Sequence, residues 1–122
     1  MICVINLYEV EAANIDALAS AFDVNGPWHR ISNRLPGHLH TNLLRRSTGL
    51  LFFMIQEYWE SERDYLRAEN DSEAFSFRLA LRTLVGCQQC LGIFRFRDQW
   101  ERELDSDHTY RKPSDLRNWQ MD

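Results

Sequence analysis

LLFFMIQEYW, residues 50–59, is the stretch that decides the fold. It is rich in aromatic and aliphatic residues, which favours a strand. Successive side chains of a strand point to opposite faces of a sheet, and here both sets are large and apolar: Leu51, Phe53 and Ile55 alternate with Leu50, Phe52 and Met54. Both faces of this strand must therefore be covered.

The flanking segments predict a simple alternation of elements. Three further strands are expected, at 2–10, 38–46 and 90–98. The first helical region is expected in two pieces, 12–22 and 28–34, separated by a break at Asn25-Gly26-Pro27, and the second in two helices, 62–70 and 73–85. Ser61 with Asp64, and Asp71 or Ser72, are the expected caps of the last two helices. The strand at 38–46 is less apolar, which favours a position nearer the sheet edge. The order β-α-β-β-α-β predicts an α+β fold of the ferredoxin-like type, with four antiparallel strands and helices on one face.

The second face of such a sheet is usually polar, but three strands of this chain are apolar on both sides. Leaving three large side chains of residues 50–59 in water would forgo about 5–9 kcal/mol, which is comparable with the whole stability of a small domain. A second copy packed sheet against sheet solves the problem economically. We therefore expect an obligate homodimer that forms a dimeric α+β barrel.

Composition excludes several classes of protein. The chain has 122 residues, a net charge of −4 and a single lysine, Lys112, which argues against nucleic-acid binding. No apolar run reaches the roughly 18 residues of a membrane helix, and residues 1–10 lack the features of a signal peptide. Three cysteines make no disulfide framework, so a cytoplasmic protein with reduced thiols is expected.

Two parts of the chain are expected: one domain over residues 1–98 and a polar extension over 99–122. The extension contains Trp100, Tyr110 and Trp119, and we expect it to pack on the domain or on the partner subunit.

PGHLHTNLLRR (36–46), EYWES (57–61) and RDYLRAENDSEAF (63–75) together resemble the antibiotic biosynthesis monooxygenase family. The pattern is Pro-Gly before a strand, then Trp-x-Ser-x-x-x-aromatic, then Ser-x-x-Phe, and the matching residues are Pro36, Gly37, Trp59, Ser61, Tyr65, Ser72 and Phe75. The resemblance covers residues 1–98 and implies a dimeric α+β barrel. Haem-degrading members place a histidine on the long helix, where this chain has none, so haem degradation is not expected.

The resemblance also implies a set of site residues. Trp59 and Tyr65 would line a substrate pocket, with Arg78 or Arg82 of the long helix nearby. Each has a structural alternative: Trp59 and Tyr65 can simply pack the end of the strand, and the two arginines can belong to a solvated helix face.

Three polar residues on strands add to the candidates. Asn6 lies among apolar neighbours and must find a partner or a ligand. His38 and His40 should project to one face, where Glu57 could join them, but a metal site needs three or four ligands. We expect the two histidines to contact substrate, and no metal. Cys87-Gln88-Gln89-Cys90 leads into a strand rather than a helix, which favours a structural or incidental role.

Two functions follow from these residues and the resemblance. The first is a cofactor-free monooxygenase that oxidises an aromatic or quinol-type small molecule in a pocket between sheet and helices. The second is a non-catalytic dimeric barrel that binds a small ligand or serves as an interaction module. A cavity of roughly 300 Å³ lined by Trp59, Tyr65 and Asn6 would favour the enzyme, and a filled core would favour the module.

Overall fold

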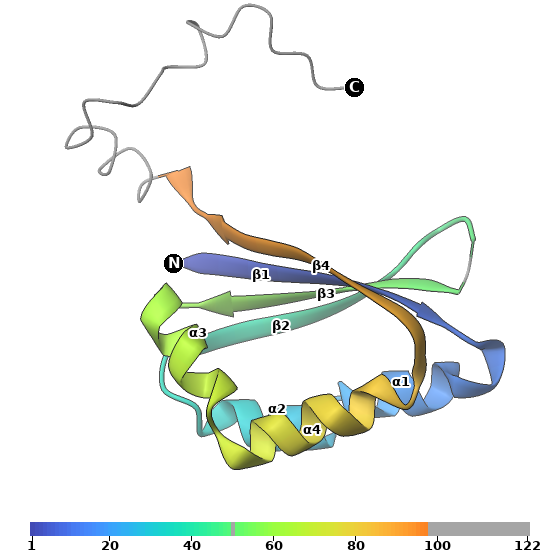
Figure 1. Ribbon diagram of the computed structural model, residues 1–122, viewed down its shortest axis with the longest axis horizontal. Helices are drawn as coiled ribbons and strands as arrows, with labels where there is room; N and C mark the ends of the chain where they lie inside the picture. Colours follow the sequence, from blue (N-terminus) through green and yellow to red (C-terminus); the bar gives the residue numbers. More distant parts are fainter. Residues whose placement is uncertain (50, 98–122) are drawn as a thin grey trace, which may run out of the picture.

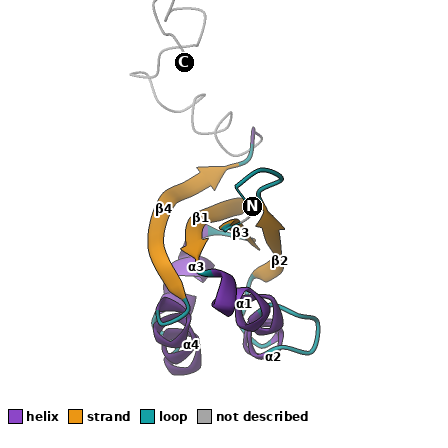
Figure 2. Cartoon of the chain, turned by 90° about the vertical axis from the view of Figure 1, so that its right-hand side faces the viewer, coloured by secondary structure: helices purple, strands orange, loops and turns teal. Residues whose placement is uncertain are grey.

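The computed structural model describes residues 1–49 and 51–97 and confirms the predicted order of elements. The elements are β1 (Ile2–Val10), the 3-10 turn η1 (Ala12–Asn14), α1 (Ile15–Ala21), α2 (Pro27–Asn33), β2 (His38–Arg45), β3 (Phe52–Trp59), α3 (Glu62–Glu69), α4 (Ser72–Arg82) and β4 (Val85–Arg95). The strands form one antiparallel sheet in the order β2-β3-β1-β4, and the helices cover one of its faces (Figures 1 and 2). β2 is an edge strand, as its weaker apolar character predicts.

The last strand differs from the prediction. β4 begins at Val85 and ends at Arg95, whereas the sequence favoured 90–98. The helix before it ends early because the amides of Thr83 and Leu84 donate to the carbonyls of Ala80 and Leu81, which tightens its final turn. Residues 86–90 are exposed, and residues 87–90 pair with β1 through their backbone, so this segment lacks the apolar alternation that marks a strand. Cys87 and Cys90 therefore lie within the strand, as unpaired thiols.

The caps fix the entry into the second half of the fold. Ser61 Oγ accepts from the Asp64 amide at 3.1 Å, and its hydroxyl donates to Asp64 Oδ2 at 2.9 Å, so the Asp64 carboxylate reaches the Ser61 side chain rather than its amide. Asp71 caps α4 by accepting from the Ala74 amide at 3.0 Å. Gly37 has a φ of +83°, and a Cβ there would lie 2.5 Å from Asp64 Cβ. The turn into β2 therefore requires glycine beside the start of α3.

The covered face of the sheet holds the core. β1 contributes the even-numbered residues from Ile2 to Val10, and β3 contributes Phe53, Ile55, Glu57 and Trp59. Between them and the helices lie two apolar clusters, one around Trp59 and Trp28 and the other around Leu18 and Leu81. α2 and α4 pack against each other over this layer.

The opposite face of the sheet has an uncovered apolar part and a polar part, in which Asn42 donates to Gln56 at 3.3 Å. Phe52, Leu44 and Phe94 are all exposed there, and a hollow of about 280 Å³ lies over Leu7 and Met54. The first half of β3 is thus apolar on both faces, with Phe52 and Met54 on the uncovered side and Phe53 and Ile55 on the covered side. Leu51 is an exposed turn residue that precedes the strand, and Leu50 lies outside the described residues.

Two further expectations concern the C-terminal extension and the absence of a membrane helix. The predicted packing of the 99–122 extension lies outside the described residues. Over residues 1–49 and 51–97, no helix has the length and apolar character needed to cross a bilayer.

Candidate functional site

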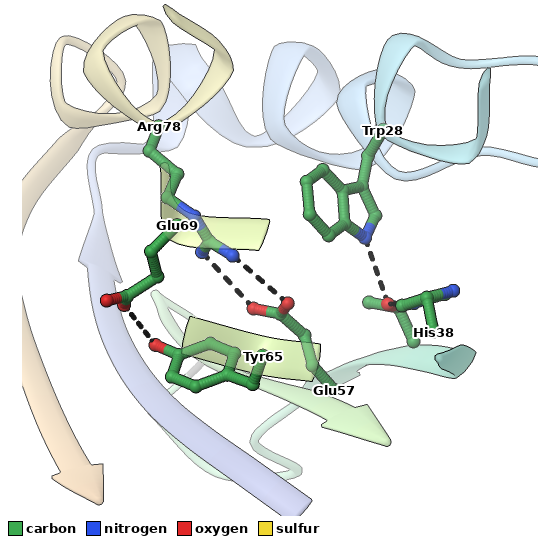
Figure 3. A network of polar contacts seen from close by, with 7 residues as sticks. Trp28, His38, Glu57, Tyr65, Glu69 and Arg78 are labelled. Carbon is green, nitrogen blue, oxygen red and sulfur yellow. Dashed lines mark hydrogen bonds and ion pairs between the residues drawn. The ribbon is translucent and has the colours of Figure 1, made fainter. Parts of the chain in front are cut away.

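A buried ion pair lies at the centre of the layer between sheet and helices (Figure 3). Arg78 Nη1 donates to Glu57 Oε2 at 3.3 Å, and Arg78 Nη2 donates to Glu57 Oε1 at 3.2 Å. The Glu57 side chain is 3% exposed and the Arg78 side chain 25%. Such a bidentate ion pair holds both charged groups in a fixed orientation.

Helical periodicity explains why Arg78 points inward. Ala74 and Leu81, one turn before and one turn after it, are both buried against the sheet. Arg78 shares their stripe, and its guanidinium carbon also lies 5.2 Å from the centre of the Trp28 ring. Arg78 is therefore not part of a solvated helix face. Arg82, one turn further along, is exposed.

Two buried phenols flank the ion pair. The Tyr65 hydroxyl donates to Glu69 Oε1, one turn later on α3, at 2.5 Å (Figure 3). Burial and this carboxylate raise the pKa of Tyr65. Burial and the charge of Glu57 raise the pKa of Tyr8, on β1, to about 12. Both hydroxyls are protonated at neutral pH, so neither can act as a base there; the Tyr8 hydroxyl can donate to a ligand, whereas the proton of Tyr65 is already donated to Glu69.

An aromatic cluster closes the other end of the layer. The Trp59 ring lies 5.8 Å from that of Tyr65 and 5.0 Å from that of His38. Thr41 Oγ1 accepts from Trp28 Nε1 at 2.9 Å and lies 2.7 Å from His38 Nε2. Burial first, and then the neighbouring His40 and His29, lower the pKa of His38 to about 4. His38 is thus neutral and weakly basic at physiological pH.

Two donors in this layer have no acceptor. Trp59 Nε1 and Arg78 Nε are buried, and neither finds a hydrogen-bond partner among the described residues. A buried polar group without a partner costs on the order of 1–3 kcal/mol and is uncommon in native proteins. An oxygen atom of a bound molecule could satisfy such donors, and the surrounding rings would contact its apolar part.

The structure brings together most of the predicted site residues. Trp59, Asn6 and Tyr65 all face the covered side of the sheet and are 0%, 5% and 8% exposed. Arg78 joins them through Glu57. Arg82 instead lines a hollow of about 270 Å³ beside α3 and α4, which Arg78 also borders.

The expected pairing of His38 with His40 on one face is wrong. The register shifts between them, so that His38 lies opposite Trp59 while His40 lies opposite Tyr58, its neighbour on the other face of the sheet. A bulge of this kind reverses the side-chain alternation and leaves no sequence signature here. Within the part of the chain that the structure describes, no group of three histidine, cysteine or carboxylate side chains could hold a metal ion.

Sequence reasoning missed Tyr8 and considered Glu57 only as a metal ligand. A signal for Glu57 existed, because it follows Phe53 and Ile55 on the inward positions of its strand. A carboxylate at such a position needs a buried cation or donor, and the arginine of the facing helix supplies it.

Neither a family model nor a curated protein sequence matches the chain. Several solved structures do. A candidate antibiotic biosynthesis monooxygenase from Nitrosomonas europaea is 17% identical, with a TM-score of 0.65, over 80% of this chain and 99% of that one. SnoaB from Streptomyces nogalater, described as a cofactor-independent oxygenase, is 19% identical, with a TM-score of 0.64, over 79% and 92%.

A third similar structure is a mutant of MhuD with two manganese protoporphyrin IX molecules in each active site. It is 22% identical, with a TM-score of 0.63, over 80% of this chain and 95% of that one. Identities this low establish the fold alone. The chain has the ferredoxin-like fold of antibiotic biosynthesis monooxygenase-type proteins over about four-fifths of its length.

Proposed function

We propose that this protein is a small oxygenase that uses O₂, without a cofactor, to oxidise an electron-rich aromatic or quinol-type molecule between its sheet and helices. The observation that carries this proposal is the Arg78–Glu57 pair, with the unpartnered donors Trp59 Nε1 and Arg78 Nε in the same layer. A phenolate is both aromatic and anionic, and it matches a layer that combines rings, a cation and free donors. The likeness to SnoaB supports the same class of reaction.

The residues of this layer would act on the charge of the substrate. Arg78 Nε, the guanidinium donor that Glu57 does not occupy, can donate to an anionic oxygen of the substrate. The neutral hydroxyl of Tyr8 can donate to an oxygen that becomes negative during the reaction, while Tyr65, which donates to Glu69, contributes its ring to the wall of the layer. His38 would contact the substrate in its neutral form.

The reaction needs no external reductant. In an anthrone, one oxygen atom of O₂ enters the ring CH₂ carbon as a carbonyl, and both hydrogens leave with the other oxygen atom as water. The electrons come from the substrate, whose enolate or phenolate reduces O₂ directly. The protein contributes binding, orientation and stabilisation of anionic intermediates.

The assembly we propose is a homodimer that covers the second face of the sheet. Phe52, Leu44 and Phe94 are exposed there, on three different strands. A patch of this kind is typical of an interface, and two-fold packing of identical sheets would bury it on both subunits.

A second candidate function is a binding or interaction module without catalysis. It is favoured by the tight packing of Trp59 and Asn6, which leaves them almost without exposed surface. Binding of an aromatic ligand that never turns over would distinguish this function from the first.

The experiment incubates metal-free protein with an anthrone or a dihydroxynaphthalene under O₂ and measures quinone formation. We expect a rate above the spontaneous one and a loss of about 100-fold in Arg78→Gln, the usual effect of removing one stabilising donor. Arg30→Gln, at an exposed position on α2, should keep the wild-type rate. Arg78→Lys preserves the charge and serves as the second variant if Arg78→Gln fails to fold. Rates equal to the spontaneous one would overturn the proposal.

A further inference from the structure

A hollow beside α3 and α4 adjoins the buried polar layer. It has a volume of about 270 Å³ and is lined by Glu69, Asn70, Phe75, Arg78, Leu79 and Arg82. Ligand pockets generally begin at roughly 300 Å³, so this one suits a molecule of one or two rings. Arg78 borders the hollow and also pairs with Glu57 inside, so its side chain lies between the hollow and the layer of the proposed function.

Two of the six residues that line the hollow are large and apolar. Phe75 and Leu79 stand one turn apart on α4 and are 55% and 45% exposed. Apolar side chains that gather beside a hollow mark a binding surface more often than single exposed ones do. Their rings and methyl groups can contact the flat face of an aromatic ligand.

One of the two arginines that line the hollow has no ion-pair partner among the described residues. Arg34 pairs with Asp71 and Glu73, and Arg78 pairs with Glu57. Arg82 forms no ion pair with any residue in the described ranges. Among the described residues, Glu69 is the only carboxylate lining the hollow, and it forms a hydrogen bond with the Tyr65 hydroxyl rather than an ion pair with Arg82. An anionic ligand could therefore pair with Arg82 without displacing a carboxylate of the protein.

We propose that the hollow is the mouth of the site and that the substrate is an aromatic carboxylate. The carboxylate binds Arg82 at the rim, and the ring lies against Phe75 and Leu79 with its oxidisable end toward Arg78. This inference rests on the proposed function, because it names the substrate class of the same site. Arg82 acts as the specificity-determining residue.

The test measures binding, so that it does not depend on turnover. Titration calorimetry compares 2-naphthoate with 2-naphthamide, which has the same ring system and no charge. A charge-assisted hydrogen bond predicts that the full-length wild-type protein binds the naphthoate at least about tenfold more tightly. Arg82→Gln should abolish this preference and leave the affinity for the amide unchanged, while Arg82→Lys should retain part of it.

The matched control is Arg30→Gln, which removes an exposed arginine of α2 and should keep the preference. Equal affinities for the two naphthalenes, a preference that survives in Arg82→Gln, or no binding of either probe would each overturn the inference. If anthrone is oxidised while no carboxylate preference exists, this inference fails alone. If the preference exists and depends on Arg82 while no substrate is oxidised, the oxygenase proposal fails alone.

Discussion

Removing Arg78 should destabilise the protein more than removing Arg78 and Glu57 together. In Arg78→Met the Glu57 carboxylate, with a side chain 3% exposed, is left buried without its cation. Breaking a buried pair in this way costs about 3–5 kcal/mol of unfolding free energy. The contact between Arg78 and the Trp28 ring adds about 0.5–2 kcal/mol to the loss.

The double variant Glu57→Gln/Arg78→Met removes both charges, so no buried ion remains unpaired. Replacing a buried pair by uncharged groups of similar volume is often close to neutral. The uncharged amide in place of the Glu57 carboxylate would lose only the hydrogen bonds, and we expect the double variant to be about 2 kcal/mol more stable than Arg78→Met. Glu57→Gln alone should fall between them, because the Arg78 side chain is 25% exposed and can be partly hydrated.

Urea unfolding, followed by tryptophan fluorescence at one fixed protein concentration, measures these differences as a double-mutant cycle. Arg34→Met is the matched control, since it removes an arginine whose partners Asp71 and Glu73 are at the surface, and it should change stability far less. Additive effects of the two single substitutions, to within about 0.5 kcal/mol, would refute the reasoning.

Three further predictions concern the rest of the fold. Met54→Asp, on the uncovered face of the sheet, should give a monomer or an unfolded chain by light scattering, and an intact dimer would contradict the interface. Gly37→Ala should cost at least about 2 kcal/mol in urea unfolding, because its φ is +83° and the new Cβ meets Asp64; an unchanged midpoint would contradict the geometry. Burial lowers the pKa of His38 from 6.5 in the unfolded chain to about 4 in the folded one, so the unfolding free energy should fall by up to about 3 kcal/mol, less after solvent screening, as the pH is lowered from 6.5 to 4. His38→Gln should make the unfolding free energy less dependent on pH over this range, and equal pH dependence in the wild type and the variant would exclude His38 as the cause.

The fold could be predicted because its signals are local. Alternation along residues 2–10 and 52–59 indicates strands, and the caps at Ser61 and Asp71 mark helix starts. The start of β4 could not be predicted, because Cys87 to Cys90 pair through the backbone and leave their side chains exposed. Nothing in their composition distinguishes that segment from a loop.

The candidate site was predicted only in part, for a different reason. Trp59 and Tyr65 came from a resemblance of motifs, and both lie in the polar layer. The pairing of Arg78 with Glu57 joins a helix to a strand 21 residues away, so it depends on tertiary packing that the sequence does not display. The separation of His38 from His40 depends on a bulge in an edge strand.

Oxygen-isotope labelling tests the central claim most directly. Metal-free protein is given an anthrone under ¹⁸O-labelled dioxygen, and the quinone is analysed by mass spectrometry against a blank without protein. Catalysis in the Arg78 layer predicts one labelled oxygen atom per quinone, formed faster than in the blank by the wild-type protein and by Arg30→Gln but not by Arg78→Gln. Quinone formed at the rate of the blank, or equally fast by Arg78→Gln, would contradict it.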